Sequence, residues 1–90
     1  MKQVNFKELN VEVGVDTFMP QDLRKDVGNV LHQASESVPM SELARNIYYS
    51  EGALDISDED YQVMTFLLSK TMKKFINDAI LRSTVEIKEK

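Results

Sequence analysis

The chain has no cysteine, and His32 is its single histidine among 90 residues. Without cysteine there is no disulfide, no thiolate nucleophile and no cysteine-based zinc site. A lone histidine with no second ligand near it in the sequence does not indicate a metal site or a catalytic base. We therefore expect no metal, no cofactor and no catalytic residue, and we predict that the protein is not an enzyme.

Other motifs that carry chemistry are also missing. There is no glycine-rich phosphate loop and no G-x-S-x-G sequence, and Ser41, Ser50 and Ser83 have no evident histidine or lysine partner. The acidic run that begins at Asp55 is not an EF-hand loop, because its twelfth position is Phe66 and the central glycine is absent. We interpret this run as the capped start of a helix.

Long apolar runs are absent as well. No stretch approaches the roughly 20 residues that span a bilayer, and no apolar segment follows the first residues. We expect no signal peptide and no membrane partner, and we place the protein in the cytoplasm.

Acidic and basic residues are unevenly distributed along the chain. The net charge is −4, which argues against a nucleic acid as partner. Residues 46–69 carry five acids and no base, whereas residues 70–90 carry six bases and three acids. A helix dipole favours this order of charges along a helix that starts in the acidic part. The dipole is therefore sufficient to explain the charge layout, without a charged partner site.

The length and the apolar fraction of 42% indicate one globular domain over residues 1–90. Leu9, Val11, Val13 and Val15 alternate with more polar residues, as in a half-buried strand. Val4 and Phe6 alternate in the opposite parity. The N-terminus is therefore predicted to be a strand or hairpin, with a bulge or turn near Lys7–Glu8, unless the first residues form a separate strand or arm.

Three helices are predicted, at about 20–34, 40–50 and 58–83, with a short strand near 53–56. Pro20 suits the first turn of the first helix, and Gly52 suits a left-handed end to the second. Gly28 lies inside the first helix, where it either permits a close backbone approach or is tolerated at about 1 kcal/mol. The predicted fold class is helix-rich α+β.

The last helix has the most regular pattern. Six apolar residues keep one phase over five turns: Tyr61, Met64, Leu68, Met72, Phe75 and Ala79. A straight helix over 58–83 would be about 39 Å long, more than the roughly 30 Å diameter of a domain of this size. We expect it to bend near Ser69–Thr71 or to pack its end on another chain. Residues 84–90 alternate again and form either an edge strand or a frayed tail.

Two DNA-binding arrangements are considered. Ser41–Arg45 is similar to the first helix of a helix-turn-helix, but the connection that follows is too long and the next helix opens with three acids. A basic strip on the last helix is the better candidate for nucleic acid, and it consists of Lys70, Lys73, Lys74 and Arg82.

The layout of Phe6–Phe18, Leu23–His32, Glu42–Tyr48 and Ile56–Asp60 resembles small uncharacterised proteins encoded by phages and prophages of gut Bacteroides-type bacteria. This resemblance implies no active site, and it favours a role in phage assembly or an accessory role, with a place in the virion if the protein is phage-encoded.

The leading functional hypothesis is a non-enzymatic protein that mediates protein–protein interaction or assembly and associates with itself. The alternative is a small DNA-binding or regulatory protein that uses the basic strip. The interface candidates are Tyr49, Met40, Phe66, Met72, Phe75, Ile76 and Ile80.

Overall fold

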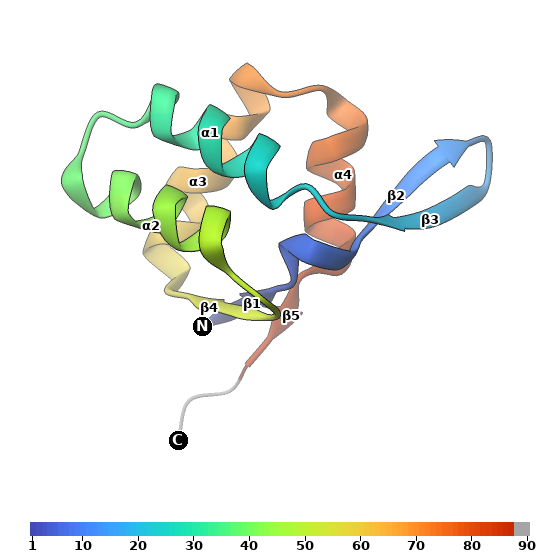
Figure 1. Cartoon of the computed structure of the whole chain (residues 1–90), viewed down its shortest axis with the longest axis horizontal. Coiled ribbons are helices and arrows are strands. Elements are labelled where there is room, and N and C mark those ends of the chain that lie inside the picture. Colours follow the sequence, from blue (N-terminus) through green and yellow to red (C-terminus); the bar gives the residue numbers. More distant parts are fainter. Residues whose placement is uncertain (88–90) are drawn as a thin grey trace.

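The computed structural model describes residues 1–87 and has four α-helices and two small antiparallel sheets (Figure 1). The α+β class, the N-terminal hairpin and the short strand in the 53–56 region are confirmed. In chain order the elements are β1 (Lys2–Val4), the 3-10 turn η1 (Phe6–Glu8), β2 (Leu9–Gly14), β3 (Thr17–Gln21), α1 (Arg24–Ala34), α2 (Val38–Tyr49), β4 (Leu54–Ile56), α3 (Asp58–Thr71), α4 (Lys74–Ser83) and β5 (Val85–Glu86).

The change of parity near the N-terminus arises from η1. The Asn5 side chain caps this turn by accepting a hydrogen bond from the Lys7 backbone N–H at 3.1 Å. The turn lets Phe6 and Leu9, which lie on either side of the parity change, both be buried. It also separates two sheets, since β1 is the central strand between β4 and β5, whereas β2 pairs with β3 in a hairpin whose turn extends beyond the helices (Figure 1).

Pro20 lies in β3, so the prediction that it starts the first helix was wrong. It lies opposite Asn10, whose backbone N–H donates to Ser83 Oγ at 3.1 Å and whose carbonyl accepts from Arg82 at 2.7 Å. The backbone groups of Asn10 therefore point to the end of α4 and not to Pro20. Because Asn10 offers no partner to an N–H at this position, no hydrogen bond between β2 and β3 is lost. Proline is tolerated in an edge strand for this reason. The helix begins only at Arg24.

Helices α1 and α2 form an antiparallel pair whose start and end signals are mostly local. Ser37 caps α2 by accepting from the Met40 N–H, and Pro39 occupies its first turn. The helix ends at Tyr49, and the Ser50 hydroxyl donates to the Ile47 carbonyl at 2.8 Å. Gly52 has no positive φ, so the predicted left-handed helix end is wrong, because Ser50 already satisfies the last turn.

The predicted helix over 58–83 is interrupted. It is replaced by α3 and α4, separated by extended backbone at Met72 and Lys73, just beyond the expected bend at Ser69–Thr71. Asn77 stabilises the break, because its side-chain amide lies within 3.0–3.2 Å of the carbonyl oxygens of Leu68, Met72 and Lys73. The interruption turns α4 back so that it packs against β2.

The core is a single hydrophobic cluster. Among the described residues, no polar or charged residue is buried. Both sheets and the four helices contribute to this core. Its largest fully buried side chains are Phe6, Leu9, Leu31, Ile47, Ile56, Met64, Leu68 and Ile80. At the C-terminus, β5 pairs with β1, so the first part of the 84–90 segment is an edge strand. Residues 88–90 of that prediction lie outside the described residues. Among residues 1–87, every helix is too short or too polar to span a bilayer.

Candidate functional site

A groove of about 460 Å³ runs between α1 and the junction of α3 with α4. Its lining residues are Asp26, Asn29, Val30, Gln33, Thr71, Met72, Lys73, Phe75 and Ile76. Val30, Met72 and Ile76 are partly buried and pack on the core, whereas Phe75 is 44% exposed. The groove thus combines apolar side chains with one acid from α1 and one base from the junction.

A smaller hollow of about 160 Å³ lies between α1 and α2 and is lined by Gly28, Asn29, His32, Ala44, Arg45, Tyr48 and Tyr49. His32 Nδ1 lies 3.1 Å from Ser41 Oγ, so the expectation that Ser41 lacks a histidine partner was wrong. The two residues are nine positions apart and meet because the helices are antiparallel. A hydrogen bond from a third group to orient the histidine, as nucleophilic catalysis normally needs, is not found among residues 1–87.

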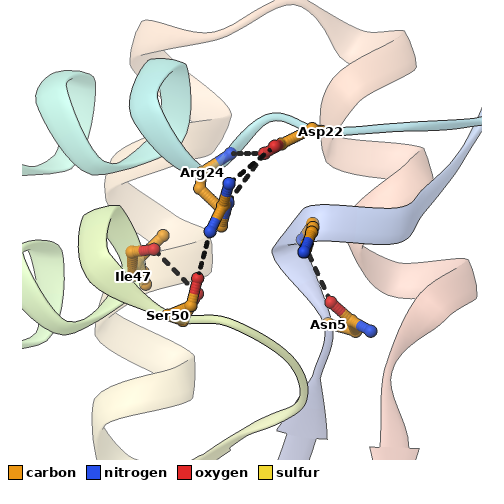
Figure 2. A network of polar contacts seen from close by, with 6 residues as sticks. Asn5, Asp22, Arg24, Ile47 and Ser50 are labelled. Atoms are coloured by element: carbon orange, nitrogen blue, oxygen red, sulfur yellow. Dashed lines mark hydrogen bonds and ion pairs between the residues drawn. The ribbon is translucent and has the colours of Figure 1, made fainter.

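The N-terminal end of α1, which forms one wall of both hollows, is fixed by Arg24 (Figure 2). Its guanidinium donates to the Asp22 carboxylate at 2.8 and 2.9 Å and to the Ser50 carbonyl at 2.5 Å. The start of α1 is thereby joined to the end of α2. Hydrogen bonding to Arg24 lowers the pKa of Asp22, and the same bond raises the pKa of Arg24.

The interface candidates from the sequence separate into three groups. Tyr49 and Phe66 are 69% and 56% exposed, and they lie on α2 and α3 outside the larger groove. Met72, Phe75 and Ile76 come together in that groove. Met40 and Ile80 are 2% and 1% exposed, so they belong to the core and cannot form a surface of the folded chain.

The basic strip is divided by the break between α3 and α4. Lys70, Lys73 and Lys74 lie close in sequence around the junction, and Lys74 pairs with Asp78 at 3.7 Å. Arg82 lies at the far end of α4, where it stacks 4.6 Å from the Phe18 ring centroid. Arg82 therefore helps to attach the hairpin to α4, and the four residues do not form one continuous helical face.

Sequence reasoning missed two parts of this surface. Val30 and Asp26 were not identified as groove residues. The hairpin also exposes apolar side chains, namely Val13, Val15, Phe18 and Met19. The sequence did contain a signal for this exposure. Phe18 and Met19 are adjacent, so in a strand they point to opposite faces and cannot both be buried on one side.

No protein-family model, curated protein or solved structure matches this chain. Within residues 1–87 there is no group of three or more histidine, cysteine, aspartate or glutamate side chains that could hold a metal ion.

Proposed function

We propose that this protein is a non-enzymatic interaction or assembly protein that associates with itself and derives from a phage. The observation that carries the proposal is the apolar surface left exposed on α3 and α4. Val63, Phe66, Phe75 and Leu81 are each between 44% and 57% exposed, although they belong to helices that supply much of the core. Val63 and Phe66 are neighbours on one face of α3, three positions apart, and exposed apolar surface of this kind is typical of an interaction site.

The groove at the α3–α4 junction forms part of this exposed surface, because Phe75 lines it. Its volume accommodates side chains of a partner, and Phe75 supplies an aromatic side chain of the kind that dominates binding energies. Asp26 and Lys73 give the groove a polar rim with both signs of charge. Apolar centres with polar rims characterise protein–protein interfaces.

Sedimentation equilibrium of the full chain from about 5 to 500 µM tests the self-association, because this range brackets the dissociation constants of small interfaces. We expect the mean mass to rise above the 10.3 kDa of the single chain. A constant mass of 10.3 kDa over the whole range would contradict self-association.

Phe75→Gln, with Val38→Gln as its control, tests the groove. Both side chains are exposed, but Val38 lies on α2 away from the groove. An apolar fluorescent dye should bind the wild-type protein saturably and bind Phe75→Gln more weakly. Equal binding to all three proteins would remove the groove from the proposal.

The second candidate function is DNA binding through the basic residues, and the gathering of Lys70, Lys73 and Lys74 at one junction is the observation in its favour. The expected sign of such binding is a salt-dependent shift of random duplex DNA. Absence of binding at about 50 mM salt would exclude it, since non-specific electrostatic binding is strongest at low salt.

A further inference from the structure

Helix α3 has one buried face and, opposite to it, one exposed face. Tyr61, Met64 and Leu68 are buried and face the core. On the other side, Glu59, Val63, Phe66 and Lys70 are all exposed, at successive spacings of four, three and four residues. At about 100° per residue, these four positions lie within a sector of about 60°. They are called the outer stripe of α3 below.

The outer stripe is self-complementary when it is reversed. The midpoint between Val63 and Phe66 along the helix is also the midpoint between Glu59 and Lys70. A second copy of α3 laid antiparallel on the first therefore places Val63 of each chain opposite Phe66 of the other. The same register places Glu59 of each chain opposite Lys70 of the other.

We infer that the self-association proposed above occurs through the outer stripe of α3, as a two-fold symmetric dimer with antiparallel helices; this inference rests on the proposed function. A two-fold interface uses the same patch on both subunits, so every contact must be formed between the patch and its reversed copy. The outer stripe satisfies this condition with two apolar pairs at its centre and two ion pairs at its ends.

The charges select the antiparallel orientation. A parallel arrangement in the same register would bring Glu59 to Glu59 and Lys70 to Lys70, and such like-charge pairs disfavour an interface. The neighbouring charges act in the same direction, because α3 begins with Asp58, Glu59 and Asp60 and is followed by Lys73 and Lys74. The antiparallel dimer brings each acidic end to a basic end.

In the single chain, Lys70 already covers part of the apolar centre. Its ammonium nitrogen lies 4.3 Å from the centroid of the Phe66 ring. In the dimer, Val63 of the second copy would take over this contact with Phe66, and the flexible Lys70 side chain would turn to Glu59 of that copy. The dimer thus exchanges a cation–π contact in water for apolar burial and an ion pair.

The size of the stripe sets the expected strength. With 14 residues, α3 is about 21 Å long, so a pair of such helices forms an interface at the small end of the known range. We expect a dissociation constant on the order of micromolar and a strong dependence on protein concentration.

Charge reversal tests the inference. Glu59→Lys and Lys70→Glu should each raise the dissociation constant by about tenfold or more, since each variant creates two like-charge pairs in the dimer. An equal mixture of the two variants should form a heterodimer, because the lysine introduced in one chain then faces the glutamate introduced in the other, and the native Lys70 faces the native Glu59. The double variant should dimerise like the wild-type chain. Sedimentation equilibrium measures all four samples.

Ser69→Glu is the matched control, because it places an acid in the same turn as Lys70 but outside the stripe. It should dimerise more strongly than Lys70→Glu. Phe66→Gln gives a test that does not depend on charge, and it should be monomeric while retaining wild-type circular dichroism, since the side chain is 56% exposed. Val38→Gln should leave the dimer unchanged.

The outcomes separate this inference from the proposed function. A wild-type chain that dimerises, with single charge variants that dimerise equally well or a mixture that fails to dimerise, would overturn the outer stripe and leave self-association standing. A wild-type chain that stays monomeric at all concentrations would overturn both. Loss in each single variant with recovery in the mixture and in the double variant supports the antiparallel dimer.

Discussion

Gly28 of α1 lies directly against Tyr48 of α2. A Cβ atom added at Gly28 would lie 3.0 Å from Tyr48 Cβ and 3.0 Å from the Ala44 carbonyl oxygen. Real Cβ atoms rarely approach their neighbours so closely, so the glycine permits the two helices to touch along their backbones. Of the two alternatives that the sequence left open for Gly28, the close approach is confirmed.

Gly28→Ala should lower the free energy of unfolding by about 1–3 kcal/mol, because the atoms it meets belong to the helix backbone and a Cβ and cannot move independently. Alanine's preference for helices opposes this loss by about 1 kcal/mol. Urea denaturation measures the difference. Gly52→Ala is the control, since nothing lies within 4 Å of its Cβ position, and it should be neutral. A stabilised Gly28→Ala protein would show that the helices separate easily.

Asn77→Asp should weaken the junction between α3 and α4. The amide nitrogen that lies near three carbonyl oxygens becomes an acceptor that repels them, and the expected cost is about 1–3 kcal/mol. Thermal unfolding followed by circular dichroism measures it. Asp78→Asn removes only the surface pair with Lys74 and should cost about 1 kcal/mol or less. Equal losses in the two variants would mean that Asn77 does not stabilise the break.

Asp16 is the one described residue other than glycine with a positive φ, at 56°, in the turn of the hairpin. Asp16→Gly should be neutral or slightly stabilising, whereas Asp16→Val should lose about 1–2 kcal/mol, because a β-branched residue fits the left-handed region poorly. Urea denaturation of the two variants gives the comparison. An Asp16→Val protein as stable as Asp16→Gly would indicate that the turn changes its conformation at little cost.

Acid should destabilise the protein partly through Asp22. Its pKa is lowered in the folded chain by hydrogen bonding to Arg24, so its contribution is present above the ordinary value of 3.8 and is lost as pH falls through the lower, folded value. Thermal melts between about pH 2 and 7 should therefore fall less steeply for Asp22→Asn than for wild type. Identical slopes for wild type and Asp22→Asn would contradict this role.

Local signals predicted the elements that depend on near neighbours. The predicted capped helix start in the acidic run is confirmed, since the Ser57 hydroxyl accepts from the Asp60 N–H at 3.2 Å. In α2, Leu43, Ala44 and Ile47 recur at helical spacing and are all buried in the core. Both features arise from spacings within one or two helical turns, which the sequence states directly.

Several errors arise where distant segments meet. Pro20 was placed in a helix because its missing N–H suits a first turn, but Asn10 and the end of α4 made an edge strand equally compatible. Met72, Phe75 and Ile76 were chosen as interface candidates and do share a groove, but Val30 and Asp26 on its other wall come from α1. Ile80 was chosen with them and is instead buried in the core.

The sequence by itself determined the class of fold, the amphipathic faces of the helices and the charge order along α3, because each depends on residues within a few positions of one another. The tertiary structure alone decided that the 58–83 segment breaks into two helices, which apolar side chains stay exposed and that His32 meets Ser41. Those features depend on how much of each helix a small core can cover. Whether a side chain is buried is settled by what packs against it, and periodicity shows only the side on which that can happen.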